Sequence, residues 1–536
     1  MPRSDRAPEW RWYLFATIAF GTSYAVLPLY SSNQNHHFLI GIARAGEGYL
    51  RDDWIAGTVD PFPLFTALVW ILHRAGLEAL HYLVYLLLLG AYVYGLLGIT
   101  ERVFPPSPAT RTSERLVWLA AICVLHNEVV GYVIGVPLKQ MPWWQMTHWG
   151  VAEQEIFGHG AFQASSFGLL LPLALRWFLE RRPVAAASLA AAVVVVHVSY
   201  ALTAAALTLA FMVVERRRTG GYRQSLAIGS TALIIALPAV VYAAVAFAPT
   251  NAAVSAAAAA ILARHLPQET DPSVWFGVKA ALQVVLIVGG IGLSEDTDLL
   301  APLAFVFAVG VVLSLIQFVT HSASLALLFP WRVSVLLVPV ATALVVRIAI
   351  VRTRIGVRRR AAAIAVAVIA VSMIASSVRM ALNFAYYNDY RPLTTRLDRV
   401  IPAGWRADFA RALRPDTLPM MDFVRRSLVR GELFLIPPDL ERFRLRSGAP
   451  AVVDAKSHPY KDVEVLEWSA RLALSRRFYA TGDCAVLREI LTRYGVNRVV
   501  FDASAAVGTP CEGLDQTYVD PTFAVYRVGG TRLATR

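Results

Sequence analysis

Long apolar runs, separated by short polar and basic segments, fill the first two thirds of the chain. Runs of about 17–25 apolar residues are long enough to cross a bilayer as helices. The pattern predicts about eleven membrane-spanning helices, at residues 12–30, 79–99, 116–135, 160–178, 184–198, 200–214, 225–248, 276–293, 299–319, 327–350 and 361–382. We read the first of them as a retained helix, because no small-residue cleavage site precedes the following polar loop.

Basic residues sit at alternate ends of these runs, which indicates orientation. Arginines precede the first run and cluster around residues 102–115, 176–182, 216–223 and 352–360. Loops rich in Lys and Arg stay in the cytoplasm, so we expect a cytoplasmic N-terminus. The acidic loop Ser294–Asp298 breaks the rule and leaves the topology around residues 276–320 open.

The last 154 residues (383–536) have a different pattern, in which short apolar runs alternate with helical stretches. Strands are expected at Leu433–Ile436, Ala451–Val453, Arg498–Asp502 and Ala524–Arg527, and helices at Met420–Arg430, Val463–Ser475 and Ala485–Tyr494. An odd number of spans places this segment outside the cytoplasm. We therefore predict a transmembrane domain at residues 1–382 and an extracytoplasmic α/β domain at residues 383–536.

Composition agrees with a multi-pass protein of the inner (plasma) membrane. Hydrophobic residues make up 57% of the chain and charged residues 16%, against about 25% charged residues in soluble proteins. The net charge of +13 comes from arginines at the ends of apolar runs. This placement indicates membrane topology and argues against a nucleic-acid partner.

The long loops, at residues 31–78, 136–159 and 249–275, all fall on the predicted external side, so we expect function there. The first loop has a polar start (Ser31–His37), an amphipathic stretch (Phe38–Tyr49) suited to the membrane interface, and the pair Asp52 and Asp53. Pro61 and Pro63 then precede a second short amphipathic stretch.

The second loop carries Lys139, Glu153, Glu155 and His159 beside several tryptophans. Tryptophans are common at membrane interfaces, so a simple aromatic belt explains them as well as sugar stacking does. Two carboxylates next to a membrane span are unfavourable unless the site is wet or paired. A metal site built from such residues is conceivable, but their spacing is not diagnostic.

Two further ionisable residues fall within the apolar runs. His197 lies at the external turn of a short hairpin, where it either lines a polar cavity or bonds to the backbone. Arg332, in "LLFPWRVSVLL", begins the tenth run on the external side. It either grips a lipid phosphate bidentately or extends to the interface.

The first-loop layout and the plan of many spans followed by an external α/β domain resemble the glycosyltransferase C superfamily. The segments "ILTRYGVNRVVFD" and "ELFLIPPDLERFRLRSGAPAVVDAKSHPYKDVEVLEWSARL" resemble elements of related, uncharacterised bacterial membrane proteins. The resemblance implies transfer of a sugar from a polyprenyl-phosphate donor to a cell-envelope acceptor on the external face. The chain has no Gly-rich phosphate loop, which also favours a lipid-linked donor over a sugar nucleotide.

The resemblance implies site roles, with one departure. Arg332, together with His159, His197 and Lys139, would hold the lipid phosphate. Where the superfamily has an acidic pair after the first helix, this chain has Asn33–His37, so Asp52, Asp53, Glu153 and Glu155 are the candidate carboxylates for proton transfer or a divalent cation.

Other interpretations remain open at this point. The missing acidic pair also fits a non-catalytic protein that binds or assembles lipid-linked glycans, and a transporter or flippase is a weaker third alternative. Cys484 and Cys511 either form a disulfide in an oxidising compartment or are two unpaired thiols. The sugar, the acceptor and the oligomeric state are not indicated.

Overall fold

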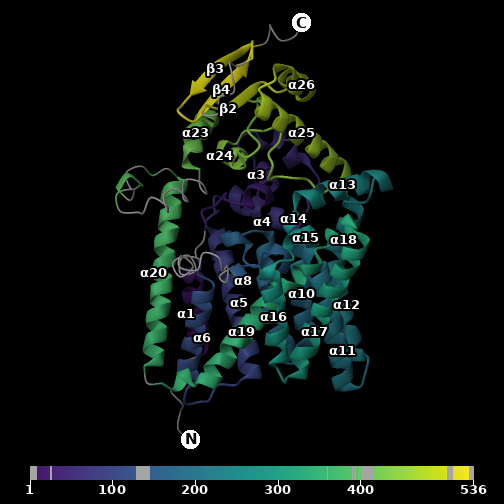
Figure 1. The fold of residues 1–536 in the computed structure, drawn as a ribbon, viewed down its shortest axis with the longest axis vertical. Coiled ribbons are helices and arrows are strands. Elements are labelled where there is room, and N and C mark those ends of the chain that lie inside the picture. Colours follow the sequence, from purple (N-terminus) through teal and green to yellow (C-terminus); the bar gives the residue numbers. More distant parts are fainter. Residues whose placement is uncertain are drawn as a thin grey trace. The chain divides into compact units, whose positions relative to one another are not determined.

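The structure is a computed structural model and describes residues 9–24, 27–127, 145–358, 360–388, 390, 394–396, 399, 414–503 and 511–529. The chain divides into two compact units that do not follow sequence order (Figure 1). The helical unit comprises residues 1–26, 79–245 and 262–380. The mixed unit comprises residues 27–78, 246–261 and 381–536, so it joins the predicted first external loop with the C-terminal segment.

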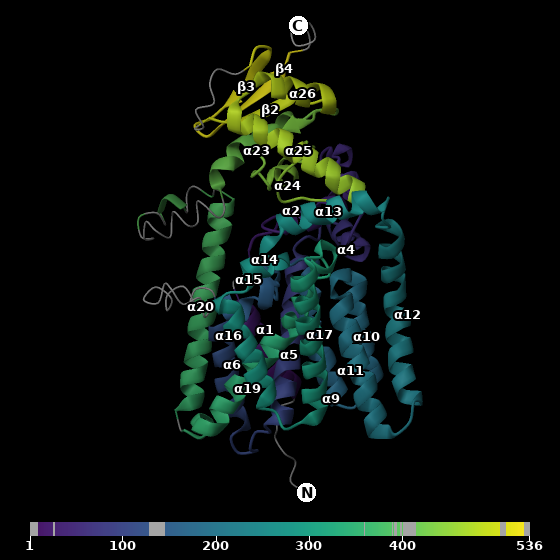
Figure 2. The same cartoon turned by 45° about the vertical axis from the view of Figure 1, so that its right-hand side comes forward.

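The helical unit is built on long apolar helices. Its α-helices are α1 (Glu9–Ser23), α5 (Leu80–Val103), α6 (Arg111–Leu125), α8 (Gln145–His148), α9 (Leu171–Leu179), α10 (Pro183–Val196), α11 (Ala201–Thr219), α12 (Arg223–Ala246), α14 (Pro267–Thr270), α15 (Pro272–Trp275), α16 (Val278–Gly292), α17 (Thr297–Thr320), α18 (Ala323–Ala326), α19 (Ser334–Thr353) and most of α20 (Ala361–Tyr387). The helices α1, α5, α6 and α19 run side by side (Figures 1 and 2). Short 3₁₀ segments, η3 (Val151–Glu153), η4 (Gly158–Gly160), η5 (Ala164–Leu170), η6 (Val198–Tyr200) and η7 (Pro330–Val333), carry polar side chains between them.

Six described helical segments are long and apolar enough to cross a membrane: Leu80–Val103, Val198–Thr219, Arg223–Ala246, Thr297–Thr320, Ala323–Thr353 and Ala361–Tyr387. Large apolar side chains stand exposed on them, for example Ile234 and Val245 on α12, which is unfavourable in water and suited to lipid. The chain is therefore a helical membrane protein. A helix overlaps each of the eleven predicted ranges, but several are short, so the number of spans and their orientation stay predictions.

The mixed unit contains a small four-stranded sheet of β1 (Phe434–Leu435), β2 (Arg498–Asp502), β3 (Leu514–Val519) and β4 (Phe523–Val528), in the order β1-β2-β4-β3. β1 pairs with β2 in parallel, and the other pairs are antiparallel. Around it lie α23 (Leu418–Ser427), α24 (Phe443–Ser447), α25 (Asp462–Thr481) and α26 (Cys484–Tyr494), and helix α13 (Ala252–His265) belongs in part to each unit. The core of the sheet includes Met420, Phe434, Phe443, Val500 and Val525.

Two differences from the predicted strands have clear causes. Ala451–Val453 forms only a single bridge to Phe434, because the chain turns at Asp454, whose carboxylate accepts the backbone N–H groups of Lys456 and Ser457. The missed strand β3, of sequence LDQTYV, is a largely exposed edge strand and lacks the apolar alternation that marks a half-buried strand.

The first-loop residues fold into α2 (Gln34–His37), α3 (Leu39–Ala45), η1 (Leu50–Asp52), η2 (Ile55–Gly57) and α4 (Pro63–Arg74). The expectation of an interfacial helix at Phe38–Tyr49 is wrong, because every α3 residue except Arg44 is buried within the mixed unit. The second stretch does form an amphipathic helix, α4, with Leu64, Trp70 and Ile71 exposed.

Candidate functional site

Arg332 has the most unusual electrostatic environment of the predicted site residues. It lies in η7 just before α19, within the candidate membrane span Ala323–Thr353. The preceding Phe329 has φ = 49°, in the left-handed region, so the chain bends sharply as it enters the span. Arg332 is only 7% exposed. A buried charge at this position marks a functional site by default in a membrane protein.

No carboxylate lies within ion-pair distance of this charge in the described part of the chain. Arg332 forms no ion pair with any described residue, and its Nε atom is buried without a hydrogen-bond partner. Two aromatic rings flank it instead, with the guanidinium carbon 5.6 Å from the ring centroid of Tyr200 and 5.4 Å from that of Phe329. Cation–π contacts are worth about 0.5–2 kcal/mol, less than the several kcal/mol that burial of a charge costs. Stable burial of the Arg332 charge therefore requires an anion, and none pairs with it among the described residues.

His197 and Tyr200 adjoin Arg332 from the turn between α10 and α11. The His197 and Tyr200 rings meet edge to face at 5.7 Å, and the Ser199 hydroxyl lies 2.7 Å from His197 Nδ1. Arg332 is close enough to both rings to interact with them electrostatically. The Tyr200 hydroxyl donates to the carbonyl of Ser165 at 2.8 Å, which fixes the ring beside the guanidinium.

Glu155 brings a carboxylate to the same place. It also interacts electrostatically with Tyr200, and its Oε2 accepts a hydrogen bond from the Gln163 amide. Gln163 is fully buried and forms a capping box with Ser166 at the start of η5, so its side chain is held in place. Hereafter we use the name Arg332 cluster for Glu155, Gln163, His197, Tyr200 and Arg332.

The other candidates from the second loop either pair with another cation or lie outside the described residues. Glu153, which is on the same loop as Glu155, forms an ion pair with Lys279 at 2.7 Å. The backbone of His159 lies in η4, but its side chain is outside the described residues, as is all of Lys139.

Asp52 and Asp53 belong to the mixed unit and have contrasting surroundings. Asp52 is exposed, whereas Asp53 is 2% exposed and its carboxylate is hydrogen-bonded. The Asp53 carboxylate accepts from Arg444 Nε at 2.6 Å, from the Ala451 N–H at 2.8 Å and from the Ile55 N–H at 2.9 Å. These contacts join the first-loop segment to the C-terminal segment, and they suit a structural carboxylate better than a base. The catalytic role of either residue stays a prediction.

Arg444 completes this arrangement, which we call the Arg444 cluster: Asp53, Arg444, Ala451 and Asp454. Arg444 also pairs with the buried Asp454 and donates to the Ala451 carbonyl at 2.9 Å. Burial acts to lower the pKa of Arg444, but the two carboxylates outweigh it and raise this pKa above its ordinary value.

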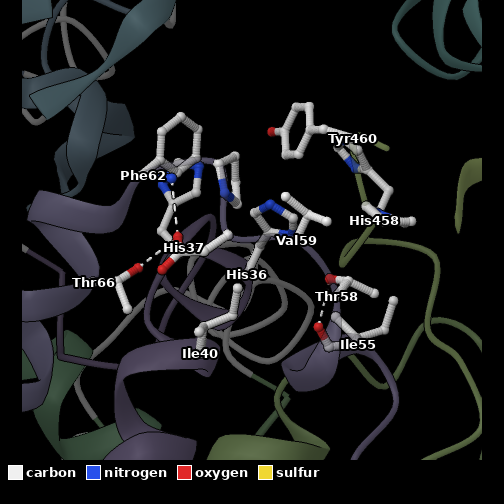
Figure 3. Close-up of a pocket in the computed structure, with 13 residues that line it drawn as sticks. His36, His37, Ile40, Ile55, Thr58, Val59, Phe62, Thr66, His458 and Tyr460 are labelled. Atoms are coloured by element: carbon white, nitrogen blue, oxygen red, sulfur yellow. Dashed lines mark hydrogen bonds between the residues drawn. The ribbon is translucent and has the colours of Figure 1, made fainter. Parts of the chain in front are cut away.

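A second polar site in the mixed unit is a small pocket lined by His36, His37, His458 and Tyr460 (Figure 3). The His36 and His458 rings stack at 5.0 Å, and the Tyr460 ring lies 5.1 Å from His458. At its edge, Asp60 accepts from the Phe62 N–H at 3.0 Å and from the Thr66 hydroxyl at 2.9 Å. The cavity of about 20 Å³ holds about one water molecule, which is too small for a sugar.

No arrangement of three or more His, Cys, Asp or Glu side chains suited to a metal ion is present among the described residues. The divalent cation considered from the sequence therefore stays a prediction. Cys484 and Cys511 are joined in the mixed unit by a disulfide, with their Cα atoms 5.6 Å apart.

Sequence reasoning found three members of the Arg332 cluster and missed two. Tyr200 follows His197 by three residues, and the turn "HVSY" could have suggested that both side chains share one site. Gln163 gives no such signal, because a buried glutamine is recognised only through its partners. The pairing of Asp53 with Arg444, 391 residues apart, also leaves no trace in one sequence.

Comparisons with known proteins give limited information. A model of a domain of unknown function (DUF6798) matches residues 415–474, the segment that contains Arg444, Asp454 and His458. No curated protein matches the chain. A crystal structure of ArnT from Cupriavidus metallidurans bound to undecaprenyl phosphate matches over 99% of this chain and 100% of that chain, with 12% identity and a TM-score of 0.44. That similarity is too weak to carry an argument about the activity of this chain.

Proposed function

We propose that this chain is a membrane glycosyltransferase that moves a sugar from a polyprenyl-phosphate donor to a cell-envelope acceptor on the external face. The observation that carries the proposal is the buried guanidinium of Arg332, which has no carboxylate partner among the described residues. A phosphate supplies the missing negative charge, and a guanidinium binds phosphate through two parallel hydrogen bonds.

The other members of the Arg332 cluster suit the transfer step. The acceptor hydroxyl oxygen bonds to the anomeric carbon of the sugar, and the bond from that carbon to the phosphate oxygen breaks. The phosphate leaves with the electron pair, and Arg332 with His197 stabilises the added charge. The acceptor proton passes to a carboxylate, for which Glu155 is the candidate in this cluster. Lys139 and His159 remain predicted phosphate-binding residues, and Asp52 remains a predicted catalytic carboxylate.

A second candidate function is supported by the engagement of the first-loop carboxylates. Asp53 is bound by Arg444 and Asp60 by Phe62 and Thr66, so both serve local structure. A protein that binds lipid-linked glycans without transferring them needs the phosphate site and no base. The two functions share Arg332 and differ in turnover.

Native mass spectrometry of the full chain in mild detergent tests the shared phosphate site. We expect a polyprenyl phosphate to copurify with the wild-type protein, and its occupancy to be at least tenfold lower in Arg332→Ala. The occupancy should be intermediate in Arg332→Lys, which keeps the positive charge and loses the paired N–H donors of the guanidinium. Arg352→Ala removes an exposed arginine from the same helix, α19, and serves as the control. Equal occupancy in Arg332→Ala and Arg352→Ala would overturn the assignment.

A transfer assay then separates the two functions. The donor is a synthetic polyprenyl-phosphate hexose, and the measured product is free polyprenyl phosphate. We expect wild-type turnover and a loss of at least a hundredfold in Glu155→Gln with donor binding retained. Donor binding without turnover in the wild-type protein would favour the binding protein.

A further inference from the structure

A second and larger binding site lies in the helical unit, at the C-terminal end of α17. A groove of about 500 Å³ opens between α14, α15 and the α17–α18 turn. Its volume is within the range of about 300–1,000 Å³ that small-molecule sites have. Figure 1 shows α14, α15 and α18 at the same end of this unit. We call it the α17 groove.

The floor of the α17 groove is rigid. Gln317 is buried and donates its amide to the carbonyl of Thr270, which ties α17 to α14. The Thr270 hydroxyl in turn donates to the carbonyls of Ala263 and Leu266, both at 2.7 Å. The groove is therefore braced by its own hydrogen bonds.

The polar groups of the wall indicate the class of ligand. Arg264 and His321 supply nitrogen donors, Asp271 supplies a carboxylate, and Ser273 and Ser322 supply hydroxyls. Asp271 Oδ1 accepts from the backbone and hydroxyl of Ser273, at 2.9 and 2.7 Å. A carboxylate in the wall repels a bare phosphate, whereas sugar hydroxyls both donate to carboxylates and accept from nitrogen donors. Mixed donors and acceptors beside the apolar ring of Phe318 suit a sugar.

The surroundings of the groove indicate that the sugar is attached to a lipid. α17 is 24 residues long, or about 36 Å, against about 30 Å for the hydrocarbon core of a bilayer. Its last turn, which borders the groove, therefore lies at the level of the lipid headgroups. Phe318 and Val319 at this end are 62% and 76% exposed, with Leu315 exposed one turn earlier. This apolar surface suits an acyl chain that extends from the groove into the bilayer.

From these observations we infer that the α17 groove binds the sugar headgroup of a membrane glycolipid, with the lipid chain against the exposed face of α17. This site is separate from the Arg332 cluster, because none of its lining residues belongs to that cluster. The inference does not depend on sugar transfer, since a binding protein would have the same groove.

Photolabelling of the full chain in phosphatidylcholine nanodiscs tests the inference. The probe is a glucosyl diacylglycerol with a diazirine at the first acyl carbons, and the reference probe is a phosphatidylcholine with the same diazirine chain. We expect the glycolipid to label peptides at residues 263–273 and 317–326 at least fivefold more than the reference does. Equal labelling by both probes would show ordinary boundary lipid and overturn the inference.

Matched variants locate the site. Ala323→Trp fills the groove and should reduce glycolipid labelling to the level of the reference probe, whereas Ser324→Trp, on the exposed neighbouring position of α18, should leave it unchanged. Should Ala323→Trp fail to fold, Asp271→Asn and His321→Asn are milder changes. Asn still caps α15 in place of Asp271, and Asn tolerates the left-handed φ of 50° at residue 321.

The lipid part of the inference has its own test. Free glucose should compete with the probe at least a hundredfold more weakly than unlabelled glucosyl diacylglycerol does. Equal competition by the free sugar would overturn the lipid attachment. If Arg332→Ala loses the copurifying polyprenyl phosphate and keeps its glycolipid labelling, the two sites are independent. If Ala323→Trp keeps its glycolipid labelling, the groove is not the site.

Discussion

Two buried arginines, one in each unit, have opposite surroundings. Arg444 is 1% exposed and is bound by Asp53, Asp454 and the carbonyl of Ala451. Arg332 is 7% exposed, is flanked by two aromatic rings and forms no ion pair with a described carboxylate. The same side chain therefore serves two purposes. Where the fold supplies the negative charge, the arginine holds segments together. Where it does not, as at Arg332, we propose that a ligand supplies the charge.

The difference has a thermodynamic consequence. Transfer of a charged side chain from water into a protein interior costs several kcal/mol per ion, and partners must offset that cost. For Arg444 they are part of the chain, so its removal leaves two buried carboxylates unpaired. For Arg332 no such partner is among the described residues, so its removal leaves no described carboxylate without its ion pair. Stability should depend on the first arginine and ligand binding on the second.

The largest effect is expected for Arg444→Leu. It should destabilise the mixed unit by about 3–5 kcal/mol, or prevent its folding, because Asp53 and Asp454 stay buried without their partner. Urea unfolding of the full chain in detergent, followed by tryptophan fluorescence, measures the change. Arg446→Leu, on the same helix α24, breaks only a surface contact to Asp422 at 3.4 Å and should change stability by no more than about 1 kcal/mol. Similar losses in both variants would contradict the structural role of Arg444.

Arg332→Leu should give the contrasting result. Without added lipid, we expect the variant to be as stable as the wild-type protein or slightly more stable, since a buried uncompensated charge is removed. Saturating polyprenyl phosphate should stabilise the wild-type protein by about 2.7 kcal/mol at a hundred times its Kd and leave the variant almost unchanged. Thermal unfolding with and without the lipid measures both quantities. A strong loss of stability in the lipid-free variant would mean that Arg332, too, is structural.

The contact of Gly48 with Gly448 provides a smaller, local test of how the mixed unit is joined. The Tyr49 N–H donates to the Gly448 carbonyl at 2.9 Å, and Gly48 has φ = 51°. A Cβ atom on Gly48 would overlap the backbone oxygen of Gly448, so Gly48→Ala adds a clash to about 1 kcal/mol of backbone strain. We expect a loss of about 2 kcal/mol in thermal unfolding. Gly57→Ala, where a Cβ atom meets nothing within 4 Å, should be nearly neutral.

Much of the fold follows from the sequence because it depends on local periodicity. The apolar runs predicted helices that the structure contains, and the strand at Arg498–Asp502 has the predicted bounds. The part that could not be predicted depends on contacts between distant segments. Nothing near residues 27–78 shows that they belong with residues 381–536, because that association depends on pairs such as Asp53 with Arg444 and Gly48 with Gly448.

The candidate site divides in the same way. Arg332, His197 and Glu155 could be named one by one, because ionisable residues in or beside apolar runs are unusual wherever they occur. Their association around Tyr200 is a property of the folded chain. Asp53 shows the limit of such reasoning, because its position in a polar loop gives no sign of the hydrogen bonds that its carboxylate accepts from Arg444 and Ala451 in the structure.

The smallest effect on stability is expected from a change in pH, through the partly exposed ion pair of Glu47 with Arg425 in the mixed unit. A hydrogen bond from His73 and the charge of Arg425 outweigh burial and hold the pKa of Glu47 below its ordinary value. Because this pKa is lower in the folded state, the contribution of Glu47 to stability is present above pH 4.5 and is lost as the pH falls through the folded-state value. Its size should be about 1 kcal/mol or less, since Arg425 is half exposed. Between pH 6 and 3.5, thermal unfolding of Glu47→Gln should depend less on pH than that of the wild-type protein, and the difference should shrink in 0.5 M salt.

Glu489→Gln, which removes an exposed carboxylate on α26, is the control and should follow the wild-type curve. If Glu47→Gln also follows it, the contacts of the Glu47 carboxylate with His73 and Arg425 add no stability to the folded state.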